Sequence, residues 1–564
     1  MIFRSVSSFL LSALSVSALS ADEWKKQSVY QVMTDRFART DGSTTASCDL
    51  STYCGGTWQG LINKLDYIQG MGFTAIWISP VVHQISAPGN VDGDSYHGYW
   101  AKDFNSLNSN FGTSEDLLRL STALHSRGMV WKPVLMFGLF TNHMAYPGCR
   151  KCVDYSTLTP FNSASYFHSP CSIDYSNTTS VQQCWQGDDN VSLPDLRTEN
   201  QNVRDFFDPW IAQLVTTYKI DGLRIDSAKH QETSFWPTFG GNATVYMVGE
   251  VYEGNPDEFL PFLDVFPGLL NYPVWYWLQR AFQSTSATMT ELNTGLANMR
   301  SKTTKTVYLG SFSENHDQPR MPAWSSQSSD TALIKNAIAF VMLMDGIPII
   351  YQGQEQKLSG ANVPANREAI WLTGYNTQSE LYQWVAQINK LRNAIIGINS
   401  AYTSSQAMSW TPDRHTIALQ KGPSGYSTQP NNCYISAEKR LTPVKQGTSS
   451  GTTTACPIPT SVAVTFTEKV TTSYGQTIKI VGNIDALGNW DINRAVTLSA
   501  SQYSSSNPIW TITINLLAGD SIQYKFINVA SSGTVAWEAD PNHSYTVPSS
   551  CGTTTAAVSN TWQS

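Results

Sequence analysis

The chain has 564 residues, which is too long for one ordinary hydrophobic core and predicts three or four domains at about 150 residues each. It contains 36 Lys and Arg against 43 Asp and Glu, a net charge of -7, and only 14% of its residues are charged. This balance argues against a polyanionic partner such as nucleic acid. Aromatic residues make up 12%, including 18 Trp and 25 Tyr, and their flat apolar rings suit neutral ligands such as sugars.

The N-terminal segment 1–21 is typical of a secretory signal peptide. An apolar run from Phe9 to Leu19 follows Arg4, and small residues come next. The run is too short to span a membrane, and no later segment approaches about 18 uninterrupted apolar residues. We therefore expect a secreted, extracellular protein without a membrane partner. Four Asn-x-Ser/Thr glycosylation motifs agree with secretion: Asn177, Asn190, Asn242 and Asn542.

Nine cysteines in an oxidising compartment favour disulfides. Cys48 and Cys54 lie close enough in sequence to close a small loop, and so do Cys171 and Cys184. The Cys-x-x-Cys pair at 149–152 has half the spacing of a zinc site, but no second Cys or His pair lies at matching spacing, so a disulfide is favoured. Three cysteines keep an open pairing at this point: Cys149, Cys152 and Cys433.

Short apolar runs alternate with amphipathic helical stretches from residue 22 to about residue 403. Such runs, separated by helices, are typical of parallel strands. The alternation predicts an α/β fold, a (β/α)8 TIM barrel, with a domain B inserted at about 142–204 between a strand and its helix. The expected strands are 28–37, 73–79, 130–140, 222–226, 245–250, 307–312 and 347–351.

A different pattern begins after residues 446–455, a Gly-, Ser- and Thr-rich stretch without an apolar anchor that predicts a linker. Downstream, apolar and polar residues alternate with the period of strands and without helical spacing. This pattern predicts a separate all-β domain, a sandwich, over 456–564. Its expected strands are 462–467, 477–481, 510–516, 521–528 and 535–538.

Acidic residues gather where the predicted strands end. In the strand that ends at Asp226, the period of two puts Arg224 and Asp226 on one face, pointing into the mouth of the barrel. A second strand ends on Glu250, and a third is followed by Asp317 beside a histidine. Like charges at close range raise one another's pKa, so one acid stays protonated while its neighbour, paired with Arg224, is ionised. Glycoside hydrolysis requires such a pair.

Each acid taken singly has an ordinary alternative as a helix cap or a structural ion pair. A histidine in the same region has an alternative as a hydrogen-bonding residue of the core. Three acids with Arg and His neighbours weaken these alternatives and favour a catalytic cluster at the carboxyl end of the barrel.

Four motifs of the sequence carry a family resemblance: Tyr96-His-Gly-Tyr-Trp100, Gly222-Leu-Arg-Ile-Asp-Ser-Ala-Lys-His230, Gly249-Glu-Val251 and Glu314-Asn-His-Asp-Gln-Pro-Arg320. They resemble the blocks of fungal α-amylases, glycoside hydrolase family 13, and the resemblance runs from about residue 24 to residue 419. It implies that Asp226 is the nucleophile, Glu250 the general acid and base, and Asp317 the acid that stabilises the transition state. A retaining double displacement of this kind needs the first two carboxyls about 5 Å apart.

The same resemblance implies a set of substrate-binding residues. Tyr99 would stack under the glucose ring, and His143 and His316 would bind its hydroxyls. Lys229 and His230 would lie on the side of the leaving sugar. The complete set is Tyr99, Trp100, His143, Arg224, Lys229, His230, His316 and Arg367.

The resemblance also implies a structural calcium ion between the barrel and the inserted domain. Ca²⁺ prefers oxygen ligands, which Asn142, Asp195 and the carbonyl of His230 would supply. A further acidic ligand is usual just before the cysteine that matches Cys184, but Gln182 stands there. Because a neutral amide binds calcium more weakly, we expect a site of reduced affinity.

Three departures from the family pattern stand out. The segment Lys132–His143 is longer than the block it resembles, contains Pro133 and lacks the aspartate expected to steady Arg224, so irregular strand pairing is expected there. Val363 replaces an acid at the sugar-binding rim, which would weaken binding of outer sugars. Residues 404–445 are too few for a complete antiparallel domain C, which is expected to be truncated.

The residues from Cys456 to the end resemble a starch-binding domain, carbohydrate-binding module family 20. The resemblance implies two sugar sites, which would raise the effective concentration of the enzyme on starch granules, and a disulfide between Cys456 and Cys551. A lone Trp in a sandwich is more often a core residue, although the turn-like polar setting of Trp490 favours exposure. The implied first site is Trp490, Trp537, Lys525 and Asn542, and the second is Tyr474, Tyr503 and Trp510.

The sequence thus predicts a secreted, monomeric, endo-acting α-1,4-glucan hydrolase whose partners are starch and other α-glucans. Two alternatives stay open. A transglycosylase of the same fold would pass the glucosyl unit to a sugar hydroxyl, and product chromatography would reveal chain elongation. A catalytically impaired starch-binding protein is suggested by the altered segment 131–141 and by the short segment 404–445, and the release of reducing ends from starch would test it.

Overall fold

The computed structural model describes residues 19–87, 89–127, 134–422, 433–436, 441–443, 461–548 and 553–564. The chain divides into two compact units, Met1–Gln446 and Gly447–Ser564, and each is described by itself. Most of the predicted signal peptide, the predicted linker and the predicted Cys456–Cys551 disulfide lie outside the described residues. Within the described ranges, no helix combines the length and the apolar character needed to cross a membrane.

Eight parallel strands form the centre of the first unit and confirm the predicted (β/α)8 barrel. Their order is β11-β10-β9-β5-β2-β1-β13-β12, and a parallel bridge between Leu270 and Gly310 joins the two ends of this sheet. All their residues are buried, as expected for a sheet covered on both faces, which explains the continuous apolar runs of the sequence. The strands are β1 (Val29–Gln31), β2 (Ala75–Ile78), β5 (Val134–Leu139), β9 (Gly222–Ile225), β10 (Tyr246–Gly249), β11 (Gly268–Leu269), β12 (Gly310–Ser311) and β13 (Ile347–Tyr351).

Two barrel strands differ from the sequence prediction. β11 has only two residues and therefore leaves no apolar run that a sequence pattern could reveal. β5 is regular, because it pairs in parallel register with β2 on one side and with β9 on the other. The expected irregular pairing is therefore wrong for the described part of the segment. Pro133 precedes β5 in the sequence, so the strand itself loses no N–H donor.

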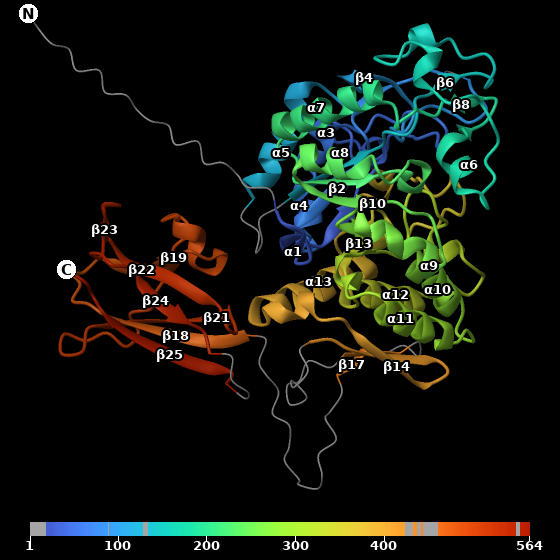
Figure 1. The fold of residues 1–564 in the computed structure, drawn as a ribbon. Coiled ribbons are helices and arrows are strands. Elements are labelled where there is room, and N and C mark those ends of the chain that lie inside the picture. Colours follow the sequence, from blue (N-terminus) through green and yellow to red (C-terminus); the bar gives the residue numbers. More distant parts are fainter. Residues whose placement is uncertain are drawn as a thin grey trace, which may run out of the picture. The chain divides into compact units, whose positions relative to one another are not determined.

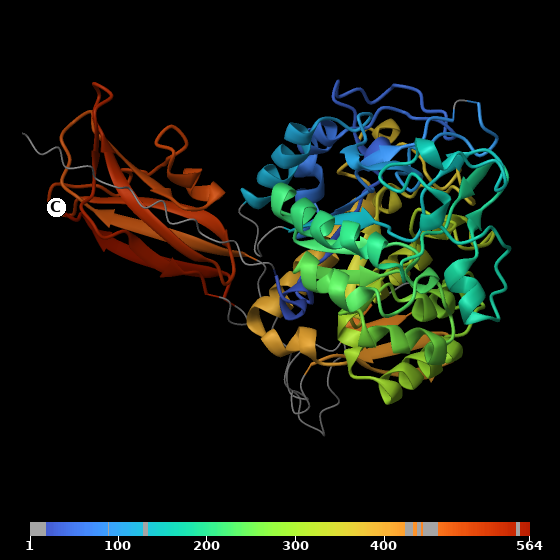
Figure 2. The same ribbon diagram turned by 45° about the horizontal axis from the view of Figure 1, so that its top comes forward.

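Helices lie around the outside of the strands (Figures 1 and 2). In α7, Val203, Phe207 and Ile211 recur at a spacing of four and are buried, so the helix turns an apolar stripe inward, and the side chain of Asn200 caps its first turn. The longer helices are α3 (Trp58–Asn63), α4 (Leu65–Gly70), α5 (Ser114–His125), α7 (Gln201–Tyr218), α8 (Trp236–Ala243), α10 (Tyr272–Phe282), α11 (Thr290–Lys302), α12 (Thr331–Leu343) and α13 (Glu380–Ile398).

Two excursions leave the barrel after β2 and after β5. The first is the antiparallel pair β3 (Val82–Gln84) and β4 (Ala101–Leu107). The second, at the position of the predicted insertion, contains a small sheet and helix α6 (Thr178–Gln183), and its disulfides are Cys149–Cys152 and Cys171–Cys184. Cys149 and Cys152 therefore pair with each other. The strands of this sheet are β6 (Tyr146–Pro147), β7 (Gln186–Gly187) and β8 (Val191–Leu193).

A four-stranded antiparallel sheet follows the last helix of the barrel, where a truncated domain C is expected. Its order is β14-β15-β16-β17. The strands are β14 (Met408–Asp413), β15 (Thr416–Gln420), β16 (Cys433–Ser436) and β17 (Leu441–Pro443). The segments 423–432 and 437–440 between them lie outside the described residues.

The second unit is all-β, as the alternating pattern predicts. One sheet has the order β21-β18-β25, and the other has the order β20-β19-β22-β23 with β24 paired to β22. Val462, Val464 and Phe466 alternate along β18 and enter one apolar core with Ile478 and Ile480 of β19. The strands are β18 (Ser461–Lys469), β19 (Thr477–Gly482), β20 (Val496–Thr497), β21 (Ile509–Leu517), β22 (Ser521–Val529), β23 (Val535–Trp537), β24 (His543–Thr546) and β25 (Thr555–Thr561).

Helix α1 (Ala21–Trp24) begins inside the segment predicted as a signal peptide. Ser20 caps this helix in a capping box with Glu23, and Leu19 is buried in the core of the first unit. Residues 19–21 therefore take part in the fold of this chain, and the end of the signal peptide at residue 21 stays a prediction.

Candidate active site

Two neighbouring strand ends hold two of the predicted acids at the same level of the barrel. Ile225 of β9 and Gly249 of β10 are paired in the parallel register, and Asp226 and Glu250 follow them directly. The N–H of Asp226 donates to the Leu139 carbonyl, and the N–H of Glu250 donates to the Ile225 carbonyl, each over 2.7 Å. The barrel backbone therefore fixes both acids.

The buried side chain of Arg224 bridges these two acids. Its Nη1 donates to Oδ1 of Asp226, and its Nη2 lies 2.9 Å from Oε2 of Glu250. Opposite Arg224 in β5 stands Gly138, so that strand offers no carboxylate, and Arg224 Nε has no hydrogen-bond partner among the described residues. The charge of Arg224 is thus shared by the two candidate catalytic acids.

This shared cation gives the two acids different protonation behaviour. Burial is the largest influence on the pKa of Asp226 and raises it, but the charge of Arg224, the influence of His143 and the hydrogen bonds from Arg224 and Ser227 together leave that pKa below its ordinary value. Burial raises the pKa of Glu250 to about 7, because the opposing charge of Arg224 is partly offset by Asp226 and Asp317. Near neutral pH the pair therefore holds one carboxylate and one carboxyl that can donate a proton.

Asp317 comes to these acids from the loop that follows β12. Its Oδ1 lies 3.2 Å from Arg367 Nη2, and its Oδ2 lies 3.3 Å from His316 Nε2. Burial lowers the pKa of His316 to about 4, so the ring is neutral near pH 7. The amide Nε2 of Gln31 donates to His316 Nδ1 over 2.8 Å, which leaves the ring proton on Nε2 toward Asp317.

Two surface hollows meet at the three acids. With their open mouths included, they measure about 1110 and 1290 Å³, and both are lined by Asp226 and Asp317. Glu250 lines only the second hollow. Other residues of the first hollow are Tyr96, His97, Tyr99, Trp100, His143, His316, Val363 and Arg367. Other residues of the second hollow are Tyr175, Lys229, His230, Tyr252, Glu253 and Tyr272.

The predicted sugar-binding residues of the first hollow include His143, whose two ring nitrogens both lie near oxygen atoms of the protein. His143 Nδ1 lies 2.8 Å from Oδ1 of Asn142, and its Nε2 lies 2.9 Å from the Tyr99 carbonyl. Both partners are oxygen acceptors, and burial lowers the pKa of His143, so the neutral ring donates to only one of them. The role of His143 in binding a sugar hydroxyl stays a prediction. The Tyr99 ring stacks with His316 at 5.3 Å between ring centres, so both are held at the wall of the hollow.

Lys229 and His230 both line the second hollow, apart from the other predicted sugar-binding residues. Lys229 Nζ lies 3.2 Å from Oε2 of Glu253 and 3.3 Å from the Tyr252 carbonyl. His230 Nδ1 lies 3.0 Å from the Val181 carbonyl. Each is therefore held by the protein at the wall of that hollow.

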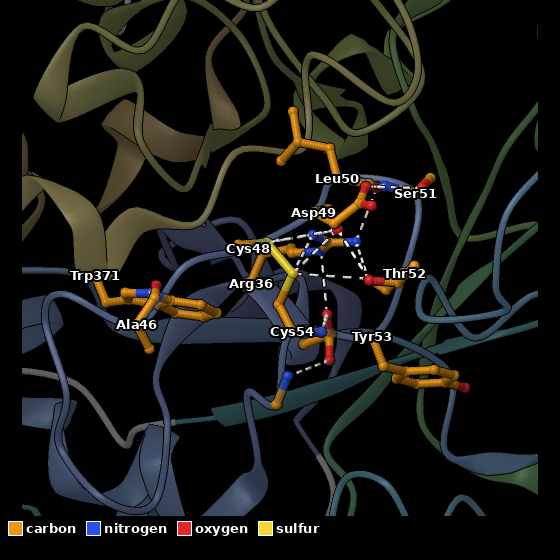
Figure 3. Close-up of a disulfide and its surroundings, with 12 residues drawn as sticks. Arg36, Ala46, Cys48, Asp49, Leu50, Ser51, Thr52, Tyr53, Cys54 and Trp371 are labelled. Atoms are coloured by element: carbon orange, nitrogen blue, oxygen red, sulfur yellow. Dashed lines mark hydrogen bonds and ion pairs between the residues drawn. A yellow bond between two sulfur atoms is a disulfide. The ribbon is translucent and has the colours of Figure 1, made fainter.

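A disulfide-closed loop brings Ser51 into the lining of the first hollow. The loop contains the Cys48–Cys54 disulfide, and Arg36 donates to three of its carbonyl groups (Figure 3). The same guanidinium lies 3.8 Å from the centre of the Tyr96 ring, which also lines the first hollow. Arg36 therefore links the loop to the wall of the hollow.

The expected calcium ligands lie near the base of the inserted segment. In the described ranges, no group of three or more His, Cys, Asp and Glu side chains is placed to hold a metal ion. Asp195 is buried with Oδ2 2.7 Å from His168 Nδ1, and burial raises its pKa to about 7 although His168 opposes this. Asn142 Nδ2 donates to Gln186 over 2.8 Å, and Gln182 Nε2 donates to a backbone carbonyl over 3.4 Å. The oxygen atoms of this set, with one buried carboxylate, fit the chemistry that Ca²⁺ prefers.

In the second unit, the predicted sugar-binding residues differ in exposure. Trp537 is 43% exposed and Tyr474 is fully exposed, whereas Trp510 is 7% exposed and packs in the core. The burial of Trp510 favours the core role that the sequence leaves open. Lys525 Nζ contacts three protein oxygen atoms, which favours a structural role for it.

The remaining predicted residues of that unit lie between these extremes. Trp490 is half-buried against a small apolar cluster, and Asn542 is exposed with its amide 3.4 Å from Gln523. The Tyr503 hydroxyl accepts from the Thr472 N–H over 3.1 Å. Trp537 and Tyr474 therefore offer the most accessible rings, whereas Trp490 and Tyr503 are half-buried.

Several residues that line the hollows or contact their lining carry no signal in the sequence motifs. The Tyr272 hydroxyl donates to Oε1 of Glu250 over 3.1 Å, and Gln186 lines both hollows. Tyr252 lies two residues beyond Glu250, and Gln31 ends β1. The same strand-end position that marks the acids could have pointed to these last two residues.

Two family profiles match the chain. The profile described as "Alpha amylase, catalytic domain" matches residues 31–453, and that described as "Starch binding domain" matches residues 461–557. The chain is 51% identical to Alpha-amylase 2 of Schwanniomyces occidentalis over 415 residues, which is 73% of this chain and 80% of that protein. It is 47% identical to an alpha-amylase of Saccharomycopsis fibuligera over 436 residues, 77% of this chain and 86% of that protein. The structure of an alpha-amylase from Malbranchea cinnamomea is similar with a TM-score of 0.70 and 39% identity, over 88% of this chain and 97% of that one.

Proposed function

Because the chain belongs to the α-amylase family of glycoside hydrolases and carries a starch-binding domain, we propose that it cleaves internal α-1,4 bonds of starch by a retaining double displacement. One observation carries this proposal. A single buried guanidinium, that of Arg224, contacts both Asp226 and Glu250. Two carboxyls held in this way, one ionised and one protonated, match the requirement for the two steps of glycosyl transfer.

In the first step, Asp226 attacks the anomeric carbon while Glu250 gives its proton to the glycosidic oxygen. The departing sugar must therefore lie against Glu250. Because Glu250 lines only the second hollow, that hollow would receive the departing sugar, and the first hollow would retain the glucose unit that reacts.

In the second step, the Glu250 carboxylate takes a proton from water, and the water oxygen attacks the anomeric carbon while the bond to Asp226 breaks. Asp317, held by Arg367 and by the neutral His316, would stabilise the positive charge that develops on the sugar ring. Tyr99 would stack against the same ring from the wall of the first hollow.

We propose that the second unit anchors the protein to starch granules through the exposed rings of Trp537 and Tyr474 and the half-buried ring of Trp490. We also propose that the protein is a secreted monomer. Secretion is supported by the N-terminal segment and by the disulfides of the described residues, Cys48–Cys54, Cys149–Cys152 and Cys171–Cys184, which suit an oxidising compartment.

We also propose a calcium ion held by Asn142, Asp195, Gln182 and the carbonyl of His230, which would tie the inserted segment to the barrel. Removing the ion with a chelator should lower the unfolding temperature of the first unit by several degrees, because an ion that binds only the folded state stabilises it. Circular dichroism on heating, with and without added calcium, measures this shift. Gln182→Glu should lower the calcium concentration that restores stability, and equal melting with and without chelator would contradict the site.

The variant Glu250→Gln tests the proposed function. It should abolish the release of reducing sugar from soluble starch and leave granule binding unchanged, because the two activities belong to different units. Glu258→Gln, a change of the same kind at an exposed acid on the next helix, serves as the control and should retain activity. Full activity of Glu250→Gln would overturn the proposed mechanism, and loss of granule binding would overturn the division of labour.

A further inference from the structure

One glycosylation motif of the sequence stands beside the rings proposed to bind starch in the second unit. The motif is Asn542-His-Ser544, and Asn542 is also one of the residues that the family resemblance implies for the first sugar site. The side chain of Asn542 is exposed, and its amide lies 3.4 Å from Oε1 of Gln523. A side chain that is open in this way can carry a bulky modification without displacing the core.

The pairing of strand β22 places Asn542 and Trp537 on the same face of the sheet. Trp537 pairs with Ile527, so these two side chains share a face. The side chain of Asn542 reaches Gln523, which lies on β22 four residues before Ile527. Residues four apart on a strand point to one face and are separated by about 13 Å. Ile527 also belongs to the small apolar cluster against which Trp490 packs. A chain of several sugar units on Asn542 is therefore long enough to reach both rings.

The connection between the two residues is held by the protein. Four residues, 538–541, separate Trp537 from Asn542. Lys525 Nζ donates to two carbonyl groups of this connection over 3.1 and 3.0 Å, and it lies 2.7 Å from Oδ1 of Asp540. The attachment point of a glycan on Asn542 is thus fixed near the Trp537 ring, and the glycan cannot swing away together with its loop.

The other three glycosylation motifs belong to the first unit. Asn177 and Asn190 lie in the inserted segment, and Asn242 lies in α8. The Asn177 side chain caps α6, and Nδ2 of Asn242 donates to the Thr238 carbonyl over 2.9 Å. Of the four motifs in the sequence, the one at 542 is the one whose asparagine is itself implied in sugar binding.

We propose that Asn542 carries an N-linked glycan that shields the first sugar site and weakens the attachment of the protein to starch granules. This inference rests on the proposed secretion and on the proposed anchoring. In the secretory pathway, Nδ2 of Asn542 bonds to the first sugar carbon of a lipid diphosphate oligosaccharide and loses one proton, while the bond from that carbon to the diphosphate oxygen breaks and the diphosphate leaves with the electron pair.

The glycan would compete with a starch chain for the Trp537 ring, on which a sugar would stack. The second implied site contains the fully exposed ring of Tyr474, which is not part of the shielded site. Because one of the two sites stays open, we expect the glycan to weaken granule binding rather than to abolish it.

The experiment separates the glycan from the asparagine that carries it. Ser544→Ala destroys the motif but keeps Asn542, and Ser544 is exposed on β24. Thr179→Ala destroys the Asn177 motif of the first unit in the same way and is the matched control. The full-length chains are secreted from a yeast host. Mass spectrometry of the peptide that contains Asn542 detects the glycan, and depletion of protein by starch granules gives the dissociation constant.

The wild-type peptide should carry a glycan, and Ser544→Ala should bind granules about threefold or more tighter than wild type, as expected when a second site joins the first. Thr179→Ala should bind as wild type does. Endoglycosidase H, applied to the folded proteins, should strengthen binding by the wild type and leave Ser544→Ala unchanged.

An unmodified Asn542, or equal binding by glycosylated wild type and Ser544→Ala, would overturn the inference, while granule binding itself would still support the proposed anchoring. Absence of granule binding by every form, Ser544→Ala included, would instead overturn the proposed anchoring and the inference with it.

Discussion

The barrel and the sandwich each bury an acid with a raised pKa, but the surroundings of the two acids differ. Glu250 contacts Arg224, the hydroxyl of Tyr272 and the N–H of Ser227, and it lines a hollow. Glu468 on β18 is 0% exposed, and its carboxyl oxygens have no hydrogen-bond partner within the described ranges. Burial raises its pKa to about 8, and the charge of Glu538 adds to this.

The comparison separates two settings in which burial raises the pKa of an acid. At Glu250 the desolvation is opposed by a cation and accompanied by access to a ligand, so the proton can be used in a reaction. At Glu468 desolvation acts without a neighbouring cation and without access to a ligand, so the raised pKa affects only the stability of the fold. Burial of an acid is therefore not enough to indicate catalysis. The convergence of a cation, a second acid and a hollow is the stronger indication.

The largest expected effect comes from weakening the cation that the barrel acids share. Arg224→Lys replaces two donors in a fixed fork by one flexible ammonium, so Asp226 and Glu250 cannot both be held. We expect kcat for soluble starch to fall by about 100-fold or more, as for loss of a preorganised charged group at an active site. Arg119→Lys, at an exposed ion pair on α5, is the matched control. Activity within threefold of wild type in Arg224→Lys would contradict the role given to this cation.

The second effect is the dependence of kcat/KM on pH. Asp226 must be ionised, and because its pKa lies below the ordinary value, activity should persist at acidic pH. Glu250 must be protonated, and its pKa of about 7 implies that activity falls about tenfold for each pH unit above that value. Initial rates from pH 3 to 10 with a soluble maltooligosaccharide measure both limbs. A plateau that continues through pH 9 would show that Glu250 is not the proton donor.

The sequence alone predicts the parts of the barrel that repeat a simple pattern. Every expected barrel run contains one strand. Asp226 and Glu250 can be predicted because each is the last residue of such a run, and Asp317 because it follows another run within a few residues. The burial of Trp510 and the contacts of Arg36 depend on residues brought together by the tertiary fold, so no local spacing reveals them. The same holds for Tyr252, whose exposure is decided by the neighbouring rings of Tyr272 and Tyr276.

A third prediction compares two tryptophans of the sandwich. Trp537→Ala should weaken binding to starch granules by about tenfold and leave the unfolding temperature nearly unchanged, because the ring is exposed. Trp510→Ala should instead destabilise the second unit by about 3–5 kcal/mol, because a buried ring leaves a cavity. Depletion of protein by granules and heating curves of the full-length chain measure the two effects. The reverse pattern would show that Trp510, not Trp537, carries the sugar site.

The smallest effect concerns Glu468 and depends on the sign of its pKa shift. The folded pKa of about 8 lies above the ordinary value of 4.5, so between these values the unfolded chain loses the proton and the folded chain keeps it. The contribution of Glu468 to the stability of the second unit should therefore be fully present below about pH 4 and be lost as pH rises toward 8. Glu468→Gln cannot ionise and should melt on the order of 5 °C higher than wild type at pH 8, with no advantage at pH 4.

Heating curves of the full-length wild type and Glu468→Gln across this pH range measure the difference between the two chains. Granule binding of Glu468→Gln at pH 6 should equal that of wild type, because the acid faces the core and no sugar. Glu258→Gln, an exposed acid of the first unit, controls for the loss of one negative charge. If the two stability curves run parallel at every pH, Glu468 is ionised inside the fold. The contrast with Glu250 would then lie in their partners alone and not in their protonation.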